Sequence, residues 1–163
     1  MTSDDASAGA GRILALDVGD RRIGVAVSDP LGLTAQPLEV IERESDRAAL
    51  GRIVQMARDY GAREIVVGIP YSARGGLTQQ GEKIARFADK LAARAGVPVV
   101  RWDERHTTLT AERVLLAADV SREKRKRARD KLAAAVLLQD YLAARKQREG
   151  ERPAENGQAQ AHR

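Results

Sequence analysis

Residues 12–27 read RILALDVGDRRIGVAV, two apolar and partly β-branched runs separated by a short polar segment. Runs of this length and composition are typical of β-strands, and the Gly19-Asp20-Arg21 segment between them suits a tight turn. We therefore expect an antiparallel hairpin, with strands at 12–18 and 22–27, at the start of the folded part of the chain. Asp17 lies inside the first apolar run, where an ionised carboxylate is costly unless a cation or hydrogen-bond donors compensate it.

Downstream of the hairpin, strand and helix patterns alternate. A third strand is expected at 38–42, and Ser45 or Asp46 can cap a helix that ends at Gly61. The remaining predicted elements are a strand at 64–70, a helix at 78–96, a strand at 97–102 and helices at 108–118 and 122–145. Three antiparallel strands followed by alternating helices and strands predict an α/β domain in which helices flank a mixed central sheet.

Length and composition limit the classes of protein to consider. The chain has 163 residues, 43% of them hydrophobic, which suits one domain with one core and is too short for a large two-domain enzyme. We expect the folded domain to cover 12–146, between disordered polar tails at 1–11 and 147–163. No run of about 18 apolar residues is present, and the N-terminus is acidic where a secretory signal would be basic. We therefore expect a cytoplasmic protein that does not contact a membrane.

Cysteine is absent, and His106 and His162 are the two histidines. Disulfides, thiolate zinc sites and cysteine nucleophiles are thereby excluded, so any metal ion would be held by oxygen ligands. The net charge is +5, and the stretch 122–131, which holds seven bases and two acids, carries that whole excess. Such a cluster favours a polyanionic partner such as a nucleic-acid backbone, although a solvated helix face would show the same pattern.

Catalysis without cysteine would depend on carboxylates, and these stand out in three places. Gly19, two residues after Asp17, lets a ligand approach closely, although Asp17 could merely cap the turn. At the end of a later strand either Asp103 or Glu104 could point into a site, and strand alternation does not decide between them. Asp130 shares a helical face with apolar residues, so it should face protein, although it could be an ordinary helix aspartate. Carboxylates from two strands and a helix would form an oxygen-only site for Mg²⁺ or Mn²⁺, and such sites hydrolyse phosphodiesters.

Four blocks of sequence resemble the bacterial YqgF/RuvX family, whose members are described as pre-16S rRNA nucleases or Holliday-junction-resolvase-like proteins. The blocks are LDVG at 16–19 with RIGVA at 22–26, VVGIP at 66–70, DERHTT at 103–108, and DKLAA at 130–134 with LQDYL at 138–142. The resemblance covers residues 12–142 and implies an RNase H-like fold, in agreement with the predicted mixed sheet. It also implies that the catalytic and metal-binding residues are Asp17, Glu104 and Asp130, which favours Glu104 over Asp103.

The predicted nucleic-acid contacts surround these carboxylates. Arg74 lies in a loop that departs from the family's usual sequence, and it adds a phosphate contact there. Arg105, Thr107 and Thr108 could also contact phosphate, although the two threonines could equally cap the next helix. The basic stretch supplies the other contacts, which are Arg122, Lys124, Arg125, Lys126, Arg127 and Arg129. His106, a second departure from the family, is interpreted as a solvent-facing turn residue rather than a proton shuttle.

The expected function is a divalent-metal-dependent nuclease that acts on structured nucleic acid. The resemblance implies two substrates, the 5′ end of pre-16S rRNA or a four-way DNA junction. We favour the rRNA, because symmetrical junction cleavage needs a two-fold dimer; a homodimer is left open, but the sequence specifies no interface for it. Most of the five aromatic residues lie in core-like patterns, so stacking on single-stranded bases is not expected. The competing classes are an actin- or hexokinase-like ATP-binding protein, for which one domain is too short, and a non-catalytic nucleic-acid-binding module.

Overall fold

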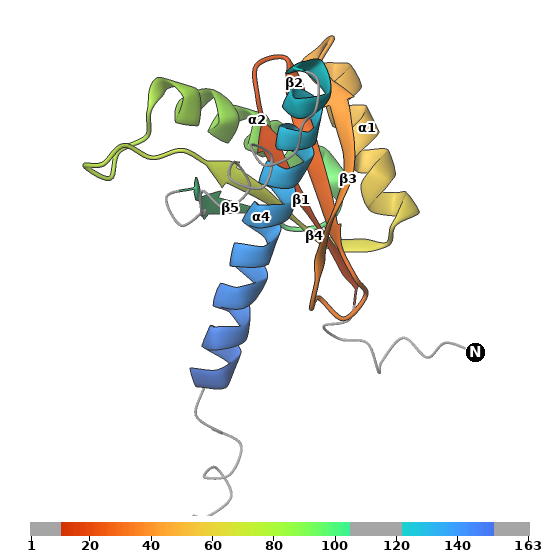
Figure 1. The fold of residues 1–163 in the computed structure, drawn as a ribbon, viewed down its shortest axis with the longest axis vertical. Coiled ribbons are helices and arrows are strands. Elements are labelled where there is room, and N and C mark those ends of the chain that lie inside the picture. Colours follow the sequence, from red (N-terminus) through yellow and green to blue (C-terminus); the bar gives the residue numbers. More distant parts are fainter. Residues whose placement is uncertain (1–10, 105–121, 152–163) are drawn as a thin grey trace, which may run out of the picture.

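The structure is a computed structural model that describes residues 11–104 and 122–151. Its strands and helices are β1 (Arg12–Val18), β2 (Arg22–Ser28), β3 (Ala35–Glu42), α1 (Asp46–Asp59), β4 (Ala62–Ile69), α2 (Gln79–Ala95), β5 (Val99–Asp103) and α4 (Arg122–Glu151). The strands form one five-stranded sheet in the order β3-β2-β1-β4-β5 (Figure 1). The first three strands are antiparallel, whereas β4 pairs parallel to β1 and β5 parallel to β4. The predicted mixed sheet is thereby confirmed.

The hairpin of β1 and β2 forms as predicted, and it sets the position of Asp17. Asp17 pairs with Gly24 across the two strands, and the N–H of Gly19 donates to the carbonyl oxygen of Arg22 at 2.8 Å in the turn. Because β1, β4 and β5 all run in the same direction, their C-terminal ends lie at one edge of the sheet. Asp17 therefore lies at the same edge as Glu104, the residue that follows β5.

Alternation along the strands divides the apolar residues between two faces of the sheet. Leu14 and Leu16 belong to the larger core, which α1 and α2 cover. Ile13 and Ala15 belong to a smaller core on the opposite face, where buried residues of α4 pack against them. Figure 1 shows α4 crossing the strands and extending well beyond the sheet. Asp17 has the same parity as Ile13 and Ala15, so it faces α4.

Two element boundaries differ from the sequence prediction by three residues or more. β3 begins at Ala35 rather than at residue 38, because its pairing with β2 continues as far as Ser28. α4 continues to Glu151, beyond residue 145 where the helix was expected to end, so residues 147–151 are helical and not part of a disordered tail. These residues include good helix formers, and Arg145 pairs with Glu149 at 3.4 Å one turn later.

Some predicted features lie outside the described residues. They are the helix expected at 108–118 and the tails at 1–10 and 152–163. Within 11–104 and 122–151, none of the helices combines the length and apolar character needed to cross a membrane.

Helix α4 approaches the sheet most closely at Gly24 of β2. A Cβ built on Gly24 would lie only 2.0 Å from the carbonyl oxygen of Asp130, a contact that no side chain allows. Glu42, at the end of β3, pairs with Arg22 at 3.6 Å and with Arg127 at 3.1 Å, which ties the N-terminal part of α4 to the sheet. Asp130 therefore lies directly over the strand that neighbours Asp17.

Replacing Gly24 by Ala is expected to lower the free energy of unfolding by about 1–3 kcal/mol, because the new methyl group forces α4 away from the sheet. The matched control is Gly51→Ala in α1, where nothing lies within 4 Å of the added Cβ. The control should gain about 0.5–1 kcal/mol, since alanine is the better helix former. Urea unfolding of both variants measures the difference, and equal stabilities would contradict the close approach at Gly24.

Candidate active site

Asp17 is the one acidic residue in an otherwise apolar strand, and it is partly buried between β2 and α4. Its neighbours Leu16 and Val18 are buried in the opposite core. Its pairing partner, Gly24, has no side chain, and this leaves room for the backbone of Asp130 in α4. The carboxyl group is therefore held by strand geometry at the α4 face of the sheet.

Glu104 reaches the same face from β5. Trp102 packs with the smaller core beneath α4, so alternation places Glu104 on that face and Asp103 on the other. Gly68 of β4 provides the space for the Glu104 side chain, because a Cβ built on Gly68 would lie 2.8 Å from its Oε1. The same Cβ would also lie 2.8 Å from a methyl carbon of Leu137 in α4. Of the two acidic residues left open by the strand pattern, Glu104 is thus the one that approaches Asp17.

Asp130 approaches from above, on α4. Its backbone lies against Gly24, and its side chain is half-buried. Arg22 carries a positive charge close enough to act on the Asp130 carboxyl group. The structure therefore brings two strand ends and one helix together at the positions that the sequence singled out.

Burial raises the pKa of all three carboxyl groups, and repulsion within the cluster adds to the shift at Asp17 and Glu104. The pKa of Asp17 rises to about 6, first because of burial and then because of the charge on Asp130. The pKa of Glu104 rises to about 7, because of burial, the charge of Asp17 and a hydrogen bond in which Glu104 donates its proton to Asp17. Burial also raises the pKa of Asp130, although basic residues of β2 and α4 oppose the shift. The cluster therefore resists ionisation unless a cation compensates it.

These oxygen ligands are of the type that Mg²⁺ and Mn²⁺ prefer. Within the described ranges, no group of three acidic or histidine side chains is close enough to hold a metal ion without rearrangement. Asp17 and Glu104 are in direct contact, whereas Asp130 acts on Asp17 through its charge. A cation that replaced the proton shared by Asp17 and Glu104 would therefore need further ligands from Asp130, water or phosphate. Mg²⁺ commonly keeps several such ligands.

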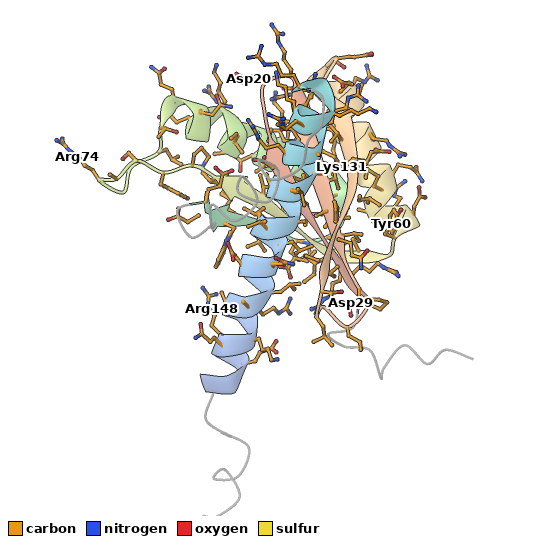
Figure 2. All side chains as sticks on the ribbon, in the orientation of Figure 1. Asp20, Asp29, Tyr60, Arg74, Lys131 and Arg148 are labelled. Carbon is orange, nitrogen blue, oxygen red and sulfur yellow. The ribbon has the colours of Figure 1, made fainter. Side chains whose placement is uncertain are left out.

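The predicted nucleic-acid contacts fall into three groups. Exposed basic side chains extend along the N-terminal part of α4, namely Arg122, Lys124, Lys126, Arg127 and Arg129, whereas Arg125 is half-buried. Figure 2 shows Arg74 at the tip of an extended loop, projecting away from α4, so the structure does not bring Arg74 to the basic stretch. Arg105, His106, Thr107 and Thr108 lie outside the described residues.

Sequence reasoning gave no role to Gly24, Gly68 or Glu42. Both glycines interrupt apolar strands, and a glycine there is a recognised sign of a close backbone or side-chain approach. That signal could have identified them. Glu42 offered no such signal, because its pairing with Arg22 and Arg127 depends on where α4 crosses the sheet.

Comparison with known proteins gives a family and close relatives. The family model that matches is described as RuvX, Holliday junction resolvase, and it covers residues 11–144. A protein of Symbiobacterium thermophilum is 53% identical over 134 residues, which are 82% of this chain and 93% of that protein. A protein of Desulforamulus reducens is 50% identical over 131 residues, which are 80% of this chain and 96% of that protein. Both relatives carry the provisional name pre-16S rRNA nuclease.

Two solved structures share the fold at low sequence identity. RuvC of T. thermophilus, in complex with a Holliday junction substrate, superimposes with a TM-score of 0.56 at 18% identity and covers 84% of this chain and 96% of that one. The Holliday junction resolvase of fowlpox virus has a TM-score of 0.50 at 14% identity and covers 82% of this chain and 99% of that one. The RNase H-like fold predicted from the sequence is confirmed by these likenesses.

Replacing Asp17 by Asn is expected to stabilise the metal-free protein at about pH 8 by about 1–3 kcal/mol. The pKa of Asp17 is about 6 in the folded chain, against 3.8 for an ordinary aspartate, so the folded state binds the proton more tightly than the unfolded state. The free energy of unfolding of the wild type must therefore fall as the pH rises between these two pKa values. The variant has no carboxyl group at this position and so does not lose this stability. Urea unfolding in EDTA at about pH 5 and about pH 8 measures the effect.

Asp29 supplies a control of opposite sign. Its carboxylate accepts backbone N–H groups of Thr34, Leu33 and Leu31, and these bonds lower its pKa. Asp29→Asn should therefore be less stable than wild type at about pH 8. An Asp17→Asn protein with the same pH dependence as wild type would contradict the electrostatic description of the site.

Proposed function

Because the chain belongs to the RuvX family, whose model describes Holliday junction resolvases, we propose that it is a divalent-metal-dependent nuclease that hydrolyses phosphodiester bonds in structured nucleic acid. The observation that carries the proposal is the meeting of Asp17 and Glu104 beneath Asp130. All three have a raised pKa, and exposed basic residues of α4 lie beside them. A merely structural cluster would have no need for three carboxyl groups that resist ionisation.

Asp17 and Glu104 are the proposed cation ligands, with Asp130 completing the acidic set. A bound divalent cation supplies charge stabilisation at the phosphate and lowers the pKa of water. In the net reaction one water is consumed, a bond from its oxygen to phosphorus forms, and the bond from phosphorus to one sugar oxygen breaks. The products are a phosphate monoester and a free hydroxyl group.

The basic residues of α4 have a separate role in this proposal. Lys124, Lys126 and Arg129 are exposed and lie within two turns of Asp130 along the helix. Contacts from such side chains to phosphates position the backbone but carry no sequence information. Recognition of a particular substrate would then rest on the shape of the duplex or junction.

The proposed substrate is the 5′ end of pre-16S rRNA, which places the activity in the cytoplasm. Its support is the name carried by relatives that are 50% and 53% identical to this chain over nearly their whole length. A four-way DNA junction is the second candidate, supported by the description of the family model and by the likeness of fold to RuvC. Junction cleavage would also require the chain to form a two-fold dimer.

Cleavage of labelled substrates tests the proposal. We expect wild type with Mg²⁺ or Mn²⁺ to cut either a pre-16S rRNA 5′ leader or a four-way junction in preference to plain duplex and single strands. Asp17→Asn, Glu104→Gln and Asp130→Asn should each slow cleavage by at least about a hundredfold, since several kcal/mol of transition-state stabilisation are lost. EDTA should abolish cleavage.

Asp20→Asn is the matched control, because Asp20 is an exposed acid in the adjoining turn, where it accepts a hydrogen bond from Gln80 at 3.3 Å. The Asp20→Asn variant should cleave the substrate at the wild-type rate. Cleavage that survives both EDTA and Asp17→Asn would contradict the metal site. Binding without any cleavage would favour a non-catalytic nucleic-acid-binding module.

Removing charge from α4 should weaken binding without changing the preference among substrates. With Lys124 and Lys126 both replaced by Gln, the slope of log K against log salt should decrease by up to about 2, because each lost phosphate contact removes about one counterion. Lys146→Gln, an exposed lysine near the other end of α4, is the control and should leave the slope unchanged. Fluorescence anisotropy over a range of salt concentrations measures both, and an unchanged slope in the double variant would contradict the role of α4.

A further inference from the structure

A pocket of about 420 Å³ lies at the edge of the sheet formed by β5, and its lining includes Asp103, the residue before Glu104. Its walls come from the loop after β4, from β5 and from α4. Three of the chain's five aromatic side chains line it, namely Tyr71, Trp102 and Tyr141, together with Arg101 and Arg148. Each of the three aromatic residues is half-buried and contributes to the lining of the pocket. The volume lies within the range of about 300–1,000 Å³ that is usual for small-molecule sites.

Two of the three aromatic side chains, Trp102 and Tyr141, are held in place by contacts with each other and with β4. The rings of Trp102 and Tyr141 meet edge to face, with centroids 5.4 Å apart and planes at 84°. The hydroxyl group of Tyr141 donates a hydrogen bond to Glu64 of β4, and Glu64 also pairs with Arg145 at 3.4 Å. Rings that are already ordered lose little conformational entropy when a flat ligand stacks against them.

A strong positive charge lies at the mouth of this pocket. Arg148 is exposed on the part of α4 that extends beyond the sheet (Figure 2), and its charge acts on the Tyr141 hydroxyl group. Arg101 is also exposed but is paired with Asp89 of α2. Arg148 is exposed, and no ion pair to it is found among the residues that the structure describes.

The pocket is also close to the proposed scissile phosphate. Trp102 and Glu104 are two residues apart and on the same face, which corresponds to about 7 Å along an extended strand. Stacked nucleotides are about 3.4 Å apart along a duplex. A base held against Trp102 would therefore belong to a nucleotide within about two positions of the phosphate at Asp17 and Glu104.

We propose that this pocket binds one unpaired nucleobase of the substrate, which stacks on Tyr71, Trp102 or Tyr141 while Arg148 contacts the adjoining phosphate. The proposal rests on the proposed nuclease function, and it specifies the substrate as a duplex with an unpaired nucleotide beside the cleavage site. It also revises the expectation that base stacking plays no part. The three aromatic residues are far apart in the sequence, and only the fold brings them to one pocket.

Trp102 is the only tryptophan of the chain, so its fluorescence reports directly on the pocket. The probes are an RNA hairpin with one unpaired nucleotide in its stem, the same hairpin with an abasic residue at that position, and the fully paired hairpin. Asp17→Asn protein with Mg²⁺ is used for binding, so that cleavage does not interfere. We expect the hairpin with the unpaired base to quench Trp102 and to bind about 5- to 150-fold more tightly than the abasic hairpin.

Three variants test the aromatic walls of the pocket in the Asp17→Asn background, with anisotropy of labelled RNA as the readout. Tyr71→Leu and Trp102→Leu should each bind the base-containing and abasic hairpins with nearly equal affinity, while Trp102→Phe should keep most of the preference. Tyr60→Leu is the matched control, since Tyr60 is exposed on the C-cap of α1, away from the pocket (Figure 2). Circular dichroism confirms that each variant is folded.

Equal affinity for the base-containing and abasic hairpins, with unchanged Trp102 fluorescence, would overturn the pocket proposal. So would failure to bind any of the hairpins. The nuclease proposal is tested separately by cleavage with wild-type protein. If wild type cuts base-containing and abasic substrates equally, the nuclease stands and the base pocket falls. If the base is preferred in binding but no substrate is cut, the base pocket stands and the nuclease proposal falls.

Discussion

The contact between α4 and Gly24 determines where the third carboxylate lies. With the carbonyl oxygen of Asp130 only 2.0 Å from where a Cβ would stand, the helix backbone rests on the strand backbone itself. Buried residues of α4 such as Ala134 and Leu137 pack against this face of the sheet, and Glu42 pairs at the surface with Arg22 and Arg127. A helix held farther from the sheet would carry Asp130 away from Asp17. The basic residues of α4 would move with it, so the acidic cluster and the proposed backbone-binding surface depend on the same contact.

The arrangement of the carboxyl groups is unfavourable for stability and useful for chemistry. Asp17 and Glu104 share a proton because neither can ionise cheaply while the other is charged, and burial adds to that cost. Gly68 contributes by leaving space for Glu104, because a Cβ there would lie 2.8 Å from Glu104 Oε1 and would force the side chain to shift. A divalent cation between these groups would replace repulsion by attraction. Structural carboxylates are ordinarily placed beside basic partners, so this cluster is better explained by ligand binding than by folding.

Much of the fold and part of the site could be predicted from the sequence, and the reasons for the differences are physical. The hairpin and the helix capped by Ser45 follow from local patterns, and both form as expected. The choice between Asp103 and Glu104 depends on which face of β5 packs beneath α4, and the residue pattern alone does not contain that information. The aromatic pocket was missed for a related reason, since Tyr71, Trp102 and Tyr141 come together only through the sheet order and the crossing of α4.

The position of a bound ion tests the central claim most directly. Crystals grown with Mn²⁺ would locate the ion through its anomalous scattering, independently of any substrate or activity. The account predicts an ion bonded to carboxylate oxygens of both Asp17 and Glu104, with Asp130 facing it and the hydrogen bond between Asp17 and Glu104 lost. An ion bound elsewhere, with Asp17 and Glu104 still sharing their hydrogen bond in its presence, would contradict the account.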